Sequence, residues 1–431
     1  MNKRVILIGL ISLVVSASIA KAQDILKLSV QEAEQYAIEH NRTMQNASLD
    51  IKQAKAARWQ TLSSMLPQVS AGFSYQNYCG YELNMMGMPP IPMNPSGTFN
   101  TTVSMALTGA QVVGTMLANL SIEMADITKQ QTEQSISKSV RSVYLSILVM
   151  EKTVSLLDSS LVNLENLERT TINAVKAGAA EQVDADQISI QVNSMKNNIN
   201  STSRSLEMLY NSLQLQLGAD INTKIELTGS LDDILNTDGI KSLLLESFDI
   251  NNNYDYQLLK KSEELTKRQV TMSWMDFLPT ISVYYQYSKL TYFGKDAGFS
   301  MTPPNMIGAS VNLPIFSSGT RVAKVKEAKI NLQKMQNTIK STEDALYVQE
   351  RQLRYNLVSA LENYENQADN IDVSQRVFNN ILTKYKYGMS SSLDVTNASN
   401  NLITAQSNYV QSVMTLLNAQ IELETLMNNN K

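Results

Sequence analysis

The chain carries the same short motifs twice and in the same order, and this repetition limits its possible folds more than any other feature. Met65–Ser70 reads MLPQVS, and Phe277–Ser282 reads FLPTIS 212 residues later. Gly178–Asp184 reads GAAEQVD, and Gly388–Asp394 reads GMSSSLD 210 residues later. Two matches at nearly equal offset indicate an internal structural repeat.

We therefore expect two similar halves, 23–235 and 236–431, each with a helix, two strands, a very long helix and a returning helix. In the first half we expect strands at about 66–77 and 99–109 and helices at about 111–177 and 181–217. In the second half we expect strands at about 278–289 and 305–315 and helices at about 319–387 and 391–428. The predicted fold class is mainly α with a small β part.

The long helices show the spacing of a coiled coil, with apolar or small residues in alternating steps of three and four. The first run is Val140, Val143, Ile147, Met150, Val154, Leu157, Leu161 and Leu164. The second is Leu402, Ala405, Tyr409, Ser412, Leu416, Ala419, Leu423 and Leu426. No proline interrupts 111–176, so one helix over this stretch would reach on the order of 100 Å at 1.5 Å per residue. An ordinary coiled coil would show the same periodicity.

The expected strands alternate apolar and polar residues, as Val69, Ala71, Phe73 and Tyr75 do with their neighbours. Both lipid-spanning strands and half-buried strands of water-soluble proteins show this pattern. If these strands lie in lipid, four cannot close a barrel, because a barrel without free edges needs about eight or more. Two chains would supply eight strands and three chains twelve. The long loops 78–97 and 290–304 would then face outward.

The first 22 residues resemble a secretory signal, with Lys3 and Arg4 before an apolar run and Ala20-Lys21-Ala22 at the expected cleavage site. Cleavage there changes the formal charge from −4 to −7 by removing three cations. An acidic exported chain without basic clusters is a poor nucleic-acid binder. No cysteine stands at the cleavage point, which argues against a lipid anchor of the lipoprotein type.

Few residues are suited to catalysis or to a cofactor. The chain has one cysteine, Cys79, and one histidine, His40, so we expect no disulfide, no imidazole metal site, no cofactor and no enzymatic activity. The acidic pairs Glu263-Glu264 and Glu343-Asp344 are predicted to be solvated helix surface. Met85, Met86, Met88 and Met93 invite a role with soft metals, although loose packing is the commoner use of methionine.

Several motifs together resemble the TolC-type outer membrane efflux protein family over nearly the whole mature chain. They are the repeated Leu-Pro entry to the first strand of each half, Leu313–Gly319 (LPIFSSG), Tyr385–Gly388 (YKYG) and Leu393-Asp394-Val395 followed by Ala398. The copies in the second half match best, because Ala106–Gly109 (ALTG) stands where the second half has Pro-Ile-Phe.

The resemblance implies a homotrimer in which each chain gives four antiparallel membrane strands to a 12-stranded β-barrel, while long coiled-coil helices form an α-helical barrel. Such a protein is a passive exit duct in the outer membrane of a Gram-negative cell, contacts outer-membrane lipid, and extends its helices into the periplasm. Its partners would be a periplasmic adaptor and an inner-membrane pump. The alternative is an exported periplasmic or surface coiled-coil scaffold. Drugs, metal ions, polysaccharides and proteins all remain possible substrates.

The resemblance also assigns roles to the two helix turns, by correspondence with the family motif. Gly178, Gly388 and Ser390 would lie at the hairpin tips and contact the adaptor. Asp184, Tyr385, Asp394 and Asn397 would form the periplasmic gate and constriction. Ser390 stands where the family has Arg, so Lys386 is a candidate substitute, and Asn397 replaces a second acid. Helix capping is the simpler role for both aspartates, and packing at a helix end is the simpler role for Tyr385.

Overall fold

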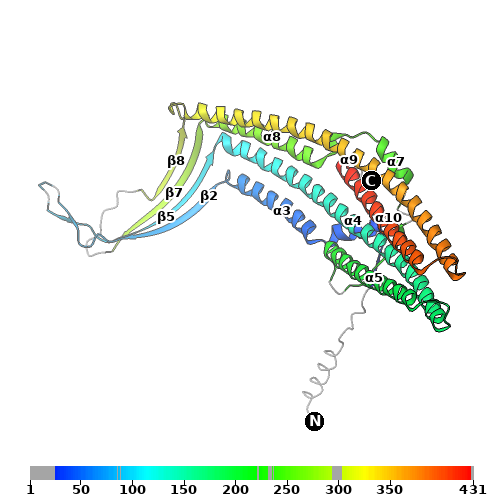
Figure 1. Cartoon of the computed structure of the whole chain (residues 1–431). Helices are drawn as coiled ribbons and strands as arrows, with labels where there is room; N and C mark the ends of the chain where they lie inside the picture. The colour runs from blue at the N-terminus through cyan, green and yellow to red at the C-terminus, as the bar shows by residue number, and fades with distance from the viewer. Residues whose placement is uncertain are drawn as a thin grey trace, which may run out of the picture. The chain divides into compact units, whose positions relative to one another are not determined.

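The computed structural model describes residues 25–84, 86–87, 89–220, 223–231, 235, 237–293 and 303–428 and is mostly helical (Figure 1). The expected signal segment lies outside the described residues, as do Met85 and Met88 of the methionine-rich loop. Within the described part, none of the helices combines the length and hydropathy that crossing a bilayer requires.

Within the described residues, the two halves share the order of a helix, two longer strands, a very long helix and a returning helix, and the first half also has short strands without a counterpart. The first half contains β1 (Leu26–Leu28), α2 (Val30–His40), α3 (Arg42–Ser63), β2 (Gln68–Gln76), β3 (Glu82–Leu83), β4 (Ile91–Pro92), β5 (Ser96–Leu107), α4 (Gly109–Lys176), α5 (Gln182–Leu217) and β6 (Ile225–Leu227). The second contains α7 (Thr237–Leu245), a 3-10 turn (Ile250–Asn252), α8 (Tyr254–Met275), β7 (Thr280–Tyr292), β8 (Asn305–Asn312), α9 (Thr320–Lys386) and α10 (Ser392–Met427).

The chain forms two compact units, and each unit takes segments from both halves. One unit contains 1–45, 132–249 and 347–431, and the other contains 46–131 and 250–346. We call the unit with 1–45, 132–249 and 347–431 the helical unit, and the unit with 46–131 and 250–346 the sheet unit. Helices α4 and α9 each begin in the sheet unit and end in the helical unit.

The sheet unit contains a four-stranded antiparallel sheet in the order β2-β5-β7-β8. The central pair joins the two halves, because β5 of the first half pairs with β7 of the second. The register puts apolar residues opposite one another across all four strands, in the row Val69, Val103, Tyr285 and Ile307. Directly opposed residues share a face, so this face of the sheet is mainly apolar, although it also carries Thr101, Lys289 and Asn305.

The opposite face of the sheet is mostly polar or small. One row across the strands is Ser70, Thr102, Gln286 and Met306, and another is Gln68, Ser104, Tyr284 and Gly308. Gly308 leaves room for the neighbouring Tyr284 ring, since a Cβ there would lie 2.6 Å from Tyr284 Cζ. The sheet therefore separates an apolar face from a polar one.

Polar contacts hold the helices of the sheet unit together beside the sheet. Lys261 of α8 lies 2.5 Å from the Glu123 carboxylate of α4, and Gln131 of α4 donates to Asp255 of α8 at 2.6 Å. Glu263 on α8 accepts from Lys267 at 2.7 Å and from Gln336 of α9 at 3.4 Å. Helix α8 is thus tied to both long helices.

The helical unit has its core between α2, α4, α5 and α10, beside the short parallel sheet β1-β6. Most of the predicted coiled-coil positions of α10 are buried: Leu402, Ala405, Ser412, Leu416, Ala419, Leu423 and Leu426. On α4 the fully buried positions include Val140 and Ile147, and also Tyr144. The Tyr144 hydroxyl donates to Leu28 O at 3.0 Å and accepts from Gly229 N at 3.1 Å, which links α4 to the chain around the small sheet.

Candidate functional site

The hairpin between α4 and α5 turns at Gly178, which has a φ of +72°. The N–H of Ala179 donates to Ala174 O at 2.8 Å, and the N–H of Gly178 donates to Val175 O at 2.9 Å. This pair of bonds is the Schellman motif, which needs a left-handed residue after the helix and so favours glycine.

The hairpin between α9 and α10 ends in the same way. Gly388 has a φ of +70°, and its N–H donates to Tyr385 O at 2.9 Å, while Met389 N donates to Lys384 O at 2.9 Å. The two predicted tip glycines therefore occupy equivalent positions, each at the reversal of one hairpin of the helical unit.

Asp184 lies in the first turn of α5 and has two kinds of partner. Its Oδ2 accepts from the Glu181 N–H at 3.2 Å, which caps the helix. Its Oδ1 accepts from the hydroxyl of Ser392, which is buried at the start of α10. The Ser392 hydroxyl also lies 3.2 Å from Gln187 Oε1. Asp184 is therefore both a capping residue and a link between α5 and α10.

Asp394 occupies the equivalent place on α10, and its partners are all on its own turn. Its Oδ2 accepts from Ser391 N at 2.9 Å, Ser391 Oγ at 2.8 Å and Ser390 Oγ at 3.0 Å. The Ser391 N–H, aided by the two hydroxyls, lowers the pKa of the Asp394 carboxyl. The expected capping role is thus present at Asp394, and Ser390, at the family's arginine position, supports it.

Tyr385 packs at the end of α9 against the buried cluster that includes Phe378, Val395 and Leu402. Its hydroxyl lies 3.1 Å from the hydroxyl of Thr171 on α4, which is 2% exposed. The tyrosine therefore connects α9 to α4 with a neutral hydrogen bond between two hydroxyls.

A cavity of about 690 Å³ lies between these helix ends, within the helical unit. It is lined by Leu167, Thr170, Thr171, Ala174, Ala179, Ala180, Asp184, Tyr385, Lys386, Gly388, Ser390, Ser391 and Ser392. Four predicted site residues thus line one cavity together with Lys386. Gly178, Asp394 and Asn397 are not among its lining residues, and the Asn397 side chain is exposed.

Sequence reasoning missed Thr171 and Ser392, which are the direct partners of Tyr385 and Asp184. It also missed the hydrogen bond from Gln191 on α5 to Asn400 on α10. Ser392 lies within the repeated Gly388–Asp394 motif, whereas no motif marks Thr171, Gln191 or Asn400, because such polar residues are common on helix faces.

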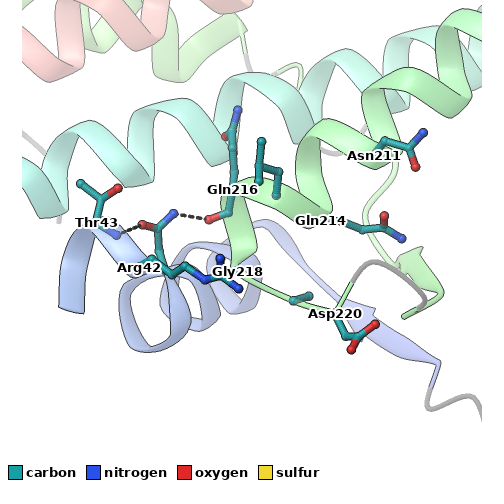
Figure 2. A pocket seen from close by; sticks show the side chains of 10 residues that line it. Arg42, Thr43, Asn211, Gln214, Gln216, Gly218 and Asp220 are labelled. Carbon is teal, nitrogen blue, oxygen red and sulfur yellow. Dashed lines mark hydrogen bonds between the residues drawn. The ribbon is translucent and has the colours of Figure 1, made fainter. Parts of the chain in front are cut away.

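A second pocket of about 620 Å³ lies in the helical unit, where α5 ends beside the break between α2 and α3. Figure 2 shows two hydrogen bonds from one asparagine side chain there. Asn41 Nδ2 donates to Gln216 O at 2.6 Å, and Asn41 Oδ1 accepts from Thr43 N at 2.7 Å. The pocket is lined by polar groups that fix a chain reversal.

The polar side chains at both sites serve mainly as hydrogen-bond partners between chain segments. Among the described residues, no cluster of three or more His, Cys, Asp or Glu side chains could hold a metal ion. The site at the hairpin tips consists of hydroxyls, amides and two carboxylates that already accept hydrogen bonds. This arrangement can hold helices together, and its bonds can open and close without covalent change.

Comparison with known proteins agrees with this geometry. Residues 250–429 match the family model described as outer membrane efflux protein. The outer membrane efflux protein BepC of Brucella suis is 29% identical over 136 residues, which is 31% of this chain and 29% of BepC. The matched stretch is therefore less than a third of that relative.

Solved structures resemble the chain over most of its length. The outer membrane protein VceC of Vibrio cholerae has a TM-score of 0.73 at 14% identity and covers 92% of this chain and 95% of its own. CusC, solved in a study of transmembrane channel formation, has a TM-score of 0.74 at 15% identity. The match covers 92% of this chain and 91% of CusC. The MtrE outer membrane channel of Neisseria gonorrhoeae has a TM-score of 0.69 at 17% identity, and the match covers 92% of this chain and 88% of MtrE.

The helical hairpins and the small antiparallel sheet define the fold of the outer-membrane channel proteins, which confirms the predicted fold class. The fold and the family match together define the class: residues 250–429 match the outer membrane efflux protein model, and the chain has the fold of the channel proteins CusC and VceC. This family consists of channels and not of enzymes.

Proposed function

We propose that this chain is one protomer of a trimeric, passive exit duct in the outer membrane of a Gram-negative cell. Its sheet would lie in the membrane, and its helices would extend into the periplasm to meet an adaptor and an inner-membrane pump. The pump supplies the energy, and the duct supplies the path.

The apolar face of the sheet is the observation that carries this proposal. Val69, Phe73 and Ile307 on that face are 70%, 69% and 79% exposed. Exposed apolar side chains occur on every strand of this face. They are costly in water, and lipid removes that cost. The face that would contact lipid is the continuous one formed by all four strands.

The free edges of the sheet support assembly of several copies. Strands β2 and β8 end the sheet in the described part of the chain. Unpaired backbone N–H and C=O groups cost several kcal/mol each in a bilayer, so the sheet must close with other copies. Three copies would give twelve strands, the number that the family resemblance implies.

Exposed apolar residues at the hairpin tips support docking of the adaptor there. Val183, Tyr387, Met389 and Leu393 are 59%, 75%, 68% and 55% exposed. They surround the turns at Gly178 and Gly388, and apolar side chains in such a group are typical of interaction surfaces. We assign the adaptor contact to this group together with Ser390.

We assign the periplasmic gate to the hydrogen bonds that tie the hairpins together. The bonds Asp184–Ser392 and Tyr385–Thr171 join different helices of one chain. Each bond contributes on the order of 1 kcal/mol to stability, so an adaptor that binds the tips can break these bonds. With Asn397 in place of a second acid, Asp394 supplies one carboxylate per chain to the constriction.

Labelling of the only cysteine tests the location of the sheet. Cys79 is exposed and lies between β2 and β3, beyond the end of the sheet that is opposite to the helices. We expect a membrane-impermeant maleimide to label intact cells, and a Cys79→Ser variant to stay unlabelled. Labelling only after lysis would place the loop behind the outer membrane, favour the scaffold alternative and contradict the proposal.

A further inference from the structure

The four connections between helices and strands lie together at one end of the sheet. The register pairs Gln68 with Ser104, Leu107 with Ile281, and Thr280 with Asn312. These residues adjoin the end of α3, the start of α4, the end of α8 and the start of α9. If the sheet spans a membrane, these helix ends lie at its headgroup layer.

The charge around this end of the sheet is opposite to that of the whole chain. The segments that flank the sheet, 55–66, 108–122, 266–279 and 313–330, contain eight cations and two acids. The cations are Lys55, Arg58, Lys267, Arg268, Arg321, Lys324, Lys326 and Lys329, and the acids are Asp276 and Glu327. The complete chain has a formal charge of −4, so cations are concentrated here.

Some of these cations are neutralised by carboxylates and others are not. Lys267 and Arg268 pair with glutamates of their own helix, and Lys324 pairs with Asp276 at 3.1 Å. Five cations have no carboxylate within 4 Å in the part of the chain that the structure describes. We call these five the basic collar: Lys55, Arg58, Arg321, Lys326 and Lys329.

Aromatic rings hold two collar cations in place. Lys329 Nζ lies 5.7 Å from the centre of the Trp274 ring, and Arg321 Cζ lies 5.0 Å from that of Phe277. The two rings are themselves 5.4 Å apart. The result is a row of cation, ring, ring and cation, in which charged groups are positioned beside apolar surface.

Both tryptophans of the chain lie in the same region. Trp59 on α3 is 64% exposed and Trp274 on α8 is 48% exposed. Tryptophan is enriched at the boundary between membrane and water, because its ring is apolar while its N–H can be hydrated. Cations beside such rings match a lipid whose phosphate lies directly above its acyl chains.

We propose that the basic collar binds the phosphate groups of anionic phospholipids in the leaflet next to the helices. This inference rests on the proposed function, because it requires the sheet to lie in lipid. Each cation near an anionic membrane surface favours binding by about five-fold. The collar therefore selects phosphatidylglycerol over a zwitterionic phospholipid and holds the protein at a defined depth.

The two tryptophans provide the measurement. In a Trp59→Phe background, Trp274 is the only tryptophan, and its fluorescence is quenched by lipids with brominated acyl chains that touch it. The full-length protein is reconstituted into phosphatidylcholine vesicles with one fifth phosphatidylglycerol. In one set of vesicles the phosphatidylcholine is brominated, and in the other the phosphatidylglycerol is. Vesicles without brominated lipid give the reference intensity. We expect quenching per molecule of brominated phosphatidylglycerol to be several times larger than quenching per molecule of brominated phosphatidylcholine. This quenching ratio should fall in 1 M salt, because salt screens exposed charges.

Variants assign the preference to the collar. Arg321→Gln with Lys329→Gln is expected to bring the quenching ratio close to one. The pair Arg321→Lys with Lys329→Arg keeps both charges and is expected to retain the preference, which controls for folding. Lys334→Gln with Lys340→Gln removes two cations further along α9 and is expected to leave the ratio unchanged.

Three results would overturn the inference. A ratio of one in the Trp59→Phe protein would contradict lipid selection while leaving the duct intact. An unchanged ratio in the double glutamine variant would contradict the role of Arg321 and Lys329. No quenching by either lipid would place Trp274 outside the bilayer, and would then contradict the proposed function as well.

Discussion

Hydrogen bonds of single residues distinguish the two hairpins of the tip region. The Asp184 carboxylate accepts from Ser392 of α10, whereas the equivalent Asp394 carboxylate accepts from its own turn. The repeat makes these two aspartates equivalent in sequence, and their partners make them different. Asp184 can therefore couple the movement of α5 to that of α10, whereas Asp394 makes no such link through its hydrogen bonds.

Removal of the Ser392 hydroxyl should loosen the gate. In Ser392→Ala, Asp184 loses its partner on α10, at a cost on the order of 1 kcal/mol in each chain. We expect a larger mean conductance in planar bilayers and greater sensitivity of cells to bulky antibiotics. Thr404→Ala is the matched control, because that hydroxyl bonds only to Asn400 O in its own helix. Equal conductance in Ser392→Ala and Thr404→Ala would exclude Ser392 from the gate.

At the level of helices and strands, most positions can be read from local pattern. The alternation predicts a strand at about 66–77, and β2 covers Gln68–Gln76. The heptad spacing and the two Gly turns predict a returning helix at about 391–428, and α10 covers Ser392–Met427. Period, capping and glycine are local properties of the chain, so they can be recognised without knowledge of the fold.

Other features of these elements have no local signal. At the break between α2 and α3, the Asn41 side chain makes a local bond with Thr43 N and a second bond to Gln216 O, which is far away in the sequence. The pairing of β5 with β7 likewise joins strands of different halves. The sequence pattern predicts which residues alternate along a strand, but it does not say which strand lies beside which.

Two glycines with the same backbone conformation should tolerate alanine differently. Gly388 and Gly218 have φ values of +70° and +71°. A Cβ at Gly388 meets open space, whereas one at Gly218 would lie 2.6 Å from His40 O. We expect Gly388→Ala to cost about 1 kcal/mol of stability through backbone strain alone. Gly218→Ala should cost more, because a backbone oxygen must also move.

Thermal unfolding followed by circular dichroism, at one protein and detergent concentration, compares the two glycine variants. A clearly lower midpoint for Gly218→Ala than for Gly388→Ala is the expected result. Equal midpoints would show that the contact with His40 does not constrain the end of α5.

For the whole molecule, the free edges of the sheet predict contact between β2 of one chain and β8 of the next. In a Cys79→Ser background, cysteines at Ser70, Gly72 or Ser74 on β2 are each combined with a cysteine at Ser310 on β8. We expect at least one combination to give disulfide-linked dimers and trimers on oxidation, and nothing larger, because the proposed trimer closes into a ring.

A control for this cross-linking uses a strand that is paired on both sides. Thr102 lies on β5, between β2 and β7, so Thr102→Cys with Ser310→Cys should give no linked oligomers. Failure of every edge combination, or a ladder that continues beyond three copies, would contradict closure as a trimer.

The amino-acid sequence by itself determined most helices and strands and the resemblance to a family, because periodicity, glycine turns and short motifs depend on neighbouring residues. It also placed Asp184, Tyr385, Gly388 and Ser390 near the hairpin turns, where the structure finds them lining one cavity. Only the tertiary structure decided that Ser392 is the partner of Asp184 and Thr171 that of Tyr385. It also decided that one apolar row crosses all four strands and that Lys329 lies over the Trp274 ring. Those relations join residues far apart in the chain, and packing alone brings them within contact distance.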